Sequence, residues 1–162
     1  MNKIFICLVF VVYSMSVFAE CPTTSTRHVK GVEPLASVLY EAAKNAEMGS
    51  WQDGTFNWEV FSYLGNLTDE KGRKLHVTYL ETIWGASSCR GSYRLILFDE
   101  KMEQVGQYNS IEKPKFIGAN KLAFPYEDEP ITEWEFKGKL PSCLEVSGDC
   151  FELKNGKSAF GY

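Results

Sequence analysis

The spacing between apolar residues changes partway along this chain, and that change constrains the fold more than any other feature. In residues 33–49, EPLASVLYEAAKNAEMG, the apolar positions Leu35, Val38, Leu39, Ala42 and Ala46 recur at intervals of three and four. This spacing predicts a helix with one apolar face. Pro34 suits its first turn and Gly49 the position after its end. From residue 55 onward the period is two, which predicts strands.

Several later runs show strand character. In residues 55–64, Val60 is one of the apolar positions that alternate with the polar Asn57 and Glu59. Residues 75–84 place Leu75, Val77, Tyr79 and Ile83 on one face, with Glu81 as a charged member of that face. Residues 93–99, YRLILFD, are apolar on both faces apart from Arg94, which is typical of a central strand. Shorter runs separated by Gly or Pro follow up to residue 153.

These runs predict a single α+β, mostly β domain. We expect a curved antiparallel sheet or sandwich of about eight strands, with one N-terminal helix packed on it. The domain is expected to span residues 33–162, and the polar residues 20–32 are expected to form an extended arm.

The first nineteen residues, MNKIFICLVFVVYSMSVFA, have the pattern of a secretory signal peptide. Lys3 supplies a positive charge, residues 4–13 form an apolar run, and Val17 and Ala19 are small residues before a cleavage position. The run is too short to span a bilayer. We therefore expect an exported protein, in the periplasm or secreted, with no membrane insertion after processing.

Charge limits the classes of partner. Without Lys3, the chain from residue 20 carries 16 basic and 21 acidic residues, a net charge of −5. Nucleic-acid binding requires a basic surface that neutralises phosphates, so a nucleic-acid partner is not expected. An acidic protein associates faster with a basic one, which favours a basic protein partner.

Cysteine number points to disulfide bonds. Removal of Cys7 with the signal peptide leaves four cysteines in an exported chain, an even number that predicts two disulfides. Cys143 and Cys150 flank LEVSGD, whose turn residues would allow a short hairpin to join them. Cys21 would then pair with Cys89.

The chain lacks an evident catalytic or metal-binding motif. His28 and His76 have no ligand partner at metal-site spacing, so neither a metal nor a cofactor is expected. Glu133 and Glu135, two apart in ITEWEF, are candidate glycosidase carboxylates. The simpler interpretation of these two residues is a solvated strand face opposite Trp134 and Phe136. A non-enzymatic protein is the favoured reading.

The loop between residues 84 and 94, WGASSCRGSYR, is the best candidate contact site. Small residues at a hairpin end can enter a concave partner site, and a disulfide at Cys89 would rigidify the loop. Arg90 can make a bidentate contact with a carboxylate. The predicted partner-binding residues in the stretch 85–92 are Ser87, Ser88, Arg90, Gly91 and Ser92.

Residues 89–110, CRGSYRLILFDEKMEQVGQYNS, resemble part of the Ivy family of periplasmic inhibitors of vertebrate lysozyme. The matching residues are Cys89, Gly91, Ser92, Arg94, Glu100, Lys101, Gln104 and Ser110. The order of a helix, GSWQDG and a strand beginning TF extends the similarity over residues 34–125. The resemblance implies a shared scaffold and a loop that inhibits lysozyme. The family's inhibitory loop carries two cysteines and a His, whereas this loop has Cys89 alone and no His.

We therefore expect a protective binding protein, either an inhibitor or an immunity or resistance protein, that acts on a lysozyme-like hydrolase or a toxin. The alternatives are a periplasmic hydrolase of cell-wall sugars that uses Glu133 and Glu135, and a carrier of a small ligand enclosed by the curved sheet.

Overall fold

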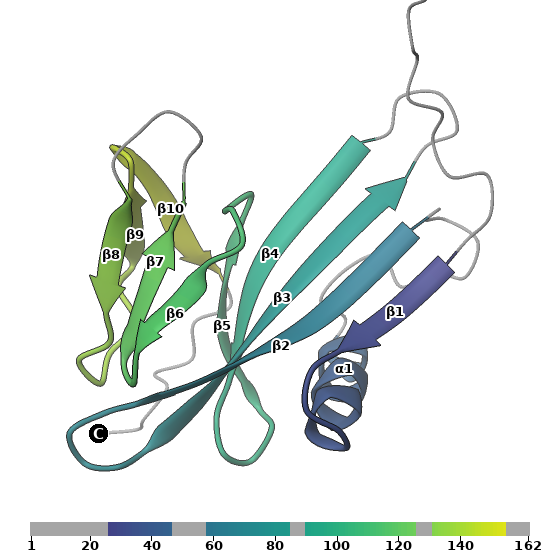
Figure 1. The fold of residues 1–162 in the computed structure, drawn as a ribbon, viewed down its shortest axis with the longest axis horizontal. Helices are drawn as coiled ribbons and strands as arrows, with labels where there is room; N and C mark the ends of the chain where they lie inside the picture. The colour runs from purple at the N-terminus through teal and green to yellow at the C-terminus, as the bar shows by residue number, and fades with distance from the viewer. Residues whose placement is uncertain (1–25, 47–57, 85–89, 126–130, 155–162) are drawn as a thin grey trace, which may run out of the picture.

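The computed structural model describes residues 26–46, 58–84, 90–125 and 131–154 (Figure 1). The described residues form one helix and ten strands, so the prediction of a mostly β single domain with one helix is confirmed, with two strands more than expected. The elements in chain order are β1 (Thr26–Lys30), α1 (Leu35–Asn45), β2 (Trp58–Thr68), β3 (Lys74–Trp84), β4 (Arg90–Phe98), β5 (Gln104–Asn109), β6 (Lys115–Gly118), β7 (Lys121–Phe124), β8 (Thr132–Glu135), β9 (Cys143–Val146) and β10 (Asp149–Lys154).

The strands form a main sheet and a small sheet. The main sheet has seven strands in the order β1-β2-β3-β4-β5-β10-β9, and the small sheet has the order β6-β7-β8. The apolar strand β4 lies in the middle of the main sheet, as its sequence predicts. The long hairpins β2–β3 and β3–β4 form the twisted centre of the molecule (Figure 1).

Strand β1 departs from the expected antiparallel pattern, because it pairs in parallel with β2 from Thr26↔Trp58 to Lys30↔Ser62. A parallel pair requires a crossover connection, and α1 lies in the chain between β1 and β2. Residues 26–30, expected in an arm outside the domain, are thus an edge strand of the main sheet.

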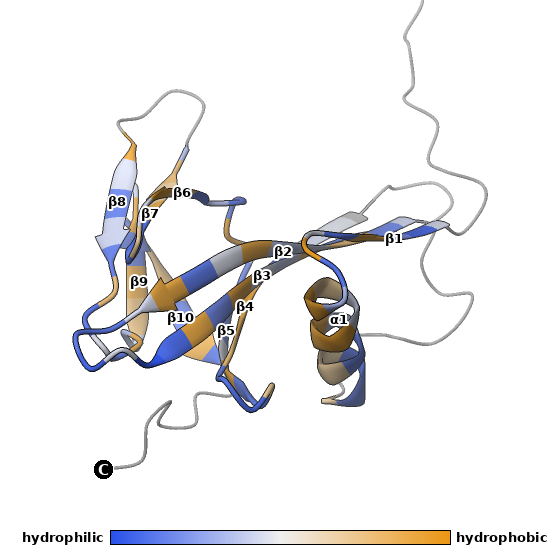
Figure 2. Ribbon diagram, turned by 60° about the horizontal axis from the view of Figure 1, so that its bottom comes forward, coloured by the Kyte–Doolittle hydropathy of each residue, from blue (hydrophilic) through white to orange (hydrophobic). Residues whose placement is uncertain are grey.

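The main sheet is covered on both faces. On one face, α1 packs against Phe61, Leu80, Ile96 and Phe98. On the opposite face, a larger core joins the main sheet to β7 of the small sheet. This core includes Leu75, Val77, Tyr79, Leu95, Leu97, Tyr108, Leu122, Phe124, Phe136 and Leu144. Figure 2 shows α1 and the small sheet on opposite sides of the main sheet. Two-sided burial explains why β4 is apolar at successive positions.

The buried face of α1 differs from the predicted one. The sheet buries Ala36, Leu39, Tyr40 and Ala43, whereas the expected core residue Val38 is 48% exposed. Both stripes have helical spacing. The observed stripe places two alanines against the sheet, which permits close approach, and directs the Tyr40 hydroxyl to a buried partner on β2.

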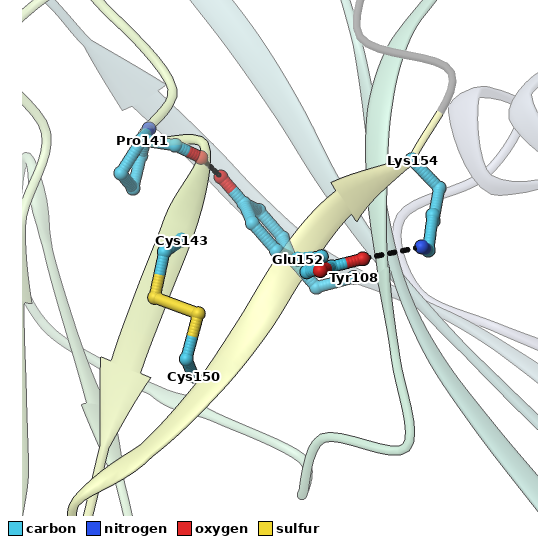
Figure 3. The surroundings of a disulfide bond; sticks show 6 residues. All are labelled: Tyr108, Pro141, Cys143, Cys150, Glu152 and Lys154. Atoms are coloured by element: carbon cyan, nitrogen blue, oxygen red, sulfur yellow. Dashed lines mark hydrogen bonds and ion pairs between the residues drawn. A yellow bond between two sulfur atoms is a disulfide. The ribbon is translucent and has the colours of Figure 1, made fainter.

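The β9–β10 hairpin carries the predicted Cys143–Cys150 disulfide (Figure 3). Its two-residue turn consists of Ser147 and Gly148, both with positive φ, which matches the twist of paired antiparallel strands. The Tyr108 hydroxyl donates a 2.8 Å hydrogen bond to the carbonyl of Pro141, which ties this hairpin region to β5 (Figure 3). The second expected pair, Cys21 and Cys89, lies outside the described residues.

Candidate functional site

The predicted contact loop sits at the end of the β3–β4 hairpin. The two strands pair continuously from His76↔Phe98 to Trp84↔Arg90. Of the predicted binding residues, Ser87 and Ser88 lie outside the described part of the chain. The backbone of Arg90 begins β4, and Gly91 and Ser92 follow it in the strand. The described parts of β3 and β4 are therefore paired up to Trp84 and Arg90, the residues on either side of 85–89.

Gly91 and Ser92 face opposite sides of the sheet, since side chains alternate along a strand. Gly91 shares its face with Tyr93, whose ring lies over the glycine. A Cβ atom on Gly91 would be 3.0 Å from the Tyr93 hydroxyl oxygen and 3.1 Å from ring carbon Cζ. Tyr93 is 41% exposed. The absence of a side chain at Gly91 thus permits an exposed tyrosine to lie flat along the strand.

Lys113, which lies outside the β3–β4 hairpin, contacts the face of the sheet that carries Gly91 and Tyr93. The Lys113 ammonium lies 3.0 Å from Ser62 Oγ on β2 and 3.3 Å from Glu81 Oε1 on β3. It also lies 5.6 Å from the centre of the Tyr79 ring. Glu81, the charged exception on an apolar strand face, is therefore held by an ion pair. Sequence reasoning did not identify Lys113, because this residue lies in the connection between β5 and β6, far from β3 in sequence.

The α1 face of the same strands contains a buried carboxylate. Glu59, one of the polar positions that alternate with apolar residues in the sequence, is 1% exposed. Tyr40 Oη donates a 3.0 Å hydrogen bond to Glu59 Oε1, and Arg27 Nε lies 3.3 Å from the same oxygen. Burial raises the pKa of Glu59, and the Tyr40 hydrogen bond and the Arg27 charge oppose that rise. These contacts join α1, β1 and β2.

Arg94, one of the residues in the Ivy-like run, also belongs to the α1 face, because its register partner Leu80 packs in the core beneath α1. Burial lowers the pKa of the Arg94 guanidinium from its ordinary value. Arg94 and Tyr93 therefore serve different faces of the hairpin.

The carboxylates of β8 lie on an exposed strand face, as the simpler interpretation predicts. Glu133 and Glu135 are exposed, whereas Phe136 is buried in the core and Trp134 packs against it. Glu135 lies 3.9 Å from Lys137 Nζ and accepts a hydrogen bond from Asn120. Across the described ranges, no three His, Cys, Asp or Glu side chains cluster in a way that could hold a metal ion. No helix among the described residues is long and apolar enough to cross a membrane.

Comparison with known proteins gives no relative. No family model matches the chain, and neither the curated proteins nor the solved structures contain a significant match.

Proposed function

We propose that this chain is an exported, disulfide-stabilised protective protein, an inhibitor or an immunity or resistance protein, that binds another exported protein through the end of the β3–β4 hairpin. The observation that carries the proposal is the hairpin itself. Its strands remain paired to Trp84↔Arg90, and Gly91 and the exposed Tyr93 lie next to its end.

Rigid presentation favours tight binding. The paired ends of β3 and β4 lose little conformational freedom when they meet a partner. The Lys113 contacts with Ser62 and Glu81 connect β2 and β3 behind this end. A lysozyme-like hydrolase and a toxin are the two candidate targets. From residue 20 onward the chain has a net charge of −5, which favours a basic partner at long range.

The proposal is tested by titrating the mature protein against a panel of lysozymes and measuring their activity. We expect stoichiometric inhibition of at least one enzyme. The Arg90→Glu variant should lose it, because Arg90 begins β4 at the contact end. The matched control is Lys71→Glu, an identical charge change in the β2–β3 turn at the other end of the hairpins.

Two other results redirect or contradict the proposal. Absence of inhibition across the panel would exclude the lysozyme target. The search would then move to toxins, with the parent protein, Arg90→Glu and Lys71→Glu each used to capture a partner from a mixture of exported proteins. Equal loss of binding in Arg90→Glu and Lys71→Glu would contradict a contact through the hairpin end. Exposure of Glu133 and Glu135 gives the hydrolase alternative no support from the described residues.

A further inference from the structure

Strand β1 is the outermost strand of the main sheet, at the opposite end of the strand order from β9 (Figure 1). It pairs with β2 on one side, and no other described strand lies on its outer side. The outer side of an edge strand presents backbone N–H and C=O groups that a further strand can bond. We call this side of Thr26–Lys30 the outer edge of β1.

The side chains of β1 are accessible, in contrast to those of its neighbour. Four of the five residues of β1 are exposed, and Val29 is half-buried. The residues of β2 that pair with Arg27–Lys30 are all buried, from Glu59 to Ser62. The change from burial to exposure between β2 and β1 identifies the outer edge of β1 as part of the molecular surface.

The outer edge of β1 has few of the features that block strand pairing. Proline, β-bulges and charged side chains are the usual ones. The sequence of β1, TRHVK, contains no proline, and its register with β2 runs without a bulge. Of its two cations, Arg27 lies 3.3 Å from Glu59 and is neutralised by that ion pair. Lys30, at the last position of the strand, carries the remaining charge.

The other edge of the main sheet is bonded to a neighbouring element. Ser147, which follows β9, donates a 3.1 Å hydrogen bond from its backbone N–H to Thr132 Oγ1 of β8. This contact holds the small sheet beside the end of β9. Of the two edges of the main sheet, the outer edge of β1 is therefore the better suited to an added strand.

The residues of β1 suit an antiparallel copy of the same strand. A two-fold axis through His28 places Thr26 opposite Lys30 of the second copy, and Arg27 opposite Val29. His28, which the formal charge count takes as neutral, then faces its own counterpart. A shift of one residue shortens the pairing and sets Arg27 opposite His28 or Lys30. Like charges directly opposite each other are destabilising, so the centred register is favoured.

From these features we infer that the outer edge of β1 pairs with β1 of a second copy of this chain, antiparallel about His28, and joins the two main sheets into one. Such a contact is isologous, because each copy contributes the same surface. The inference goes beyond the proposed binding of another exported protein and does not depend on it. Five residues from each copy make a small contact, so we expect a weak dimer that dissociates on dilution.

The dimer leaves both contact hairpins accessible. Thr26 aligns with Trp58, Trp58 with Ile83 and Ile83 with Gly91, so Thr26 lies toward the end of the sheet where β3 and β4 meet the contact loop. In the antiparallel pair, Thr26 lies opposite Lys30 of the second copy. The hairpin ends of the two copies therefore point in opposite directions, and one dimer can bind two partner molecules.

Sedimentation equilibrium of the mature protein at increasing concentration tests the inference. We expect a reversible equilibrium between monomer and dimer. His28→Lys should raise the dissociation constant of the dimer by about tenfold or more, since it sets like charges directly opposite each other. An equimolar mixture of His28→Lys and His28→Glu should restore association, because residue 28 of each variant then meets the opposite charge.

Ser142→Lys is the matched control, because it introduces the same side chain at an exposed position outside β1. It should leave the dissociation constant unchanged, with circular dichroism confirming that all variants are folded. A parent protein that stays monomeric at every concentration would overturn the inference. Equal weakening by Ser142→Lys would also overturn it, as would a mixture of the two His28 variants that associates no more tightly than His28→Lys alone.

The dimer and the hairpin contact are separable. Arg90→Glu should abolish binding of the partner protein and leave the dissociation constant of the dimer unchanged. His28→Lys should weaken the dimer and leave inhibition by the monomer intact. Loss of the dimer in Arg90→Glu would contradict pairing through β1, whereas loss of inhibition in His28→Lys would contradict a partner contact confined to the hairpin end.

Discussion

Glu59 is a carboxylate held in the interior by two neighbours of different chemistry. Tyr40 donates to it from α1, and Arg27 pairs with it from β1. A buried carboxylate that loses a donor retains its full cost of desolvation. The contacts of this one side chain therefore contribute to the docking of both α1 and β1.

We expect Tyr40→Phe to lower the free energy of unfolding by about 1–3 kcal/mol near pH 7, because it leaves the Glu59 carboxylate with one donor fewer. The loss should shrink in acid, where a Glu59 with raised pKa becomes protonated. Urea denaturation at pH 7 and pH 4 measures this effect. In a Glu59→Gln background the pH dependence of the loss should disappear; its persistence would show that another group is responsible.

Asp69 shapes the turn between β2 and β3. Burial opposes its ionisation, but hydrogen bonds from the Arg73 backbone and side chain and from the Lys71 backbone outweigh that effect, so its pKa lies below the ordinary value. A carboxyl whose pKa is lower in the folded state stabilises the fold above its ordinary pKa. That stabilisation is lost as pH falls through the lowered pKa.

Asp69→Asn should therefore be less stable than the parent protein at pH 6, and the difference should narrow toward pH 2.5. Thermal unfolding followed by circular dichroism across this range gives the comparison. Glu70→Gln, an exposed neighbour in the same turn, is the matched control. A constant difference between Asp69→Asn and parent at every pH would contradict the assigned role of the Asp69 charge.

At the scale of elements, α1 is oriented by the size of its residues. Ala43 is fully buried, and Val38 is 48% exposed. We predict that Ala43→Leu destabilises the protein by about 1–3 kcal/mol through overpacking. Val38→Ala should change stability by less than about 0.5 kcal/mol. Urea denaturation of both variants checks this, and the opposite ranking would show that α1 packs through the Val38 stripe.

The β9–β10 hairpin is a second element, and a covalent bond is one source of its stability. The Cys143–Cys150 bond closes a short loop, with a sequence separation of 7. Loop-closure entropy predicts that Cys143→Ser combined with Cys150→Ser costs about 2.5 kcal/mol. Reductant should lower the free energy of unfolding of the parent protein by this same amount. It should leave the free energy of unfolding of the double variant unchanged. An unchanged midpoint in the double variant would contradict this contribution.

At the scale of the whole molecule, the N-terminal segment is expected to direct export. Cleavage after Ala19 would give a mature chain that begins at Glu20. Intact mass measurement of the protein recovered from the periplasm or the medium should show this N-terminus. Replacement of Leu8 by Arg, which interrupts the apolar run, should retain the uncleaved chain inside the cell. Cleavage at another site, or none in the parent, would contradict the prediction.

The candidate site was only partly predictable from the sequence. A loop between two strands follows from the apolar runs on either side of it, which are local features. The sequence placed Arg90, Gly91 and Ser92 in that loop, whereas the structure places them in β4, because their backbone continues the pairing with β3. The Lys113–Glu81 ion pair could not be predicted from the sequence, because its residues are 32 positions apart. They meet only when the connection after β5 folds across β2 and β3. No periodicity within a single run encodes such a contact.

By itself, the sequence determined the existence of one helix, the strand character of the rest, the central place of β4 and the disulfide-bonded hairpin with its Ser147–Gly148 turn. These features depend on side-chain period and on backbone preferences of neighbouring residues. Only the tertiary structure decided the parallel pairing of β1, the buried face of α1 and the burial of Glu59. Each of these depends on surfaces supplied by distant segments, whose packing outweighs the local pattern.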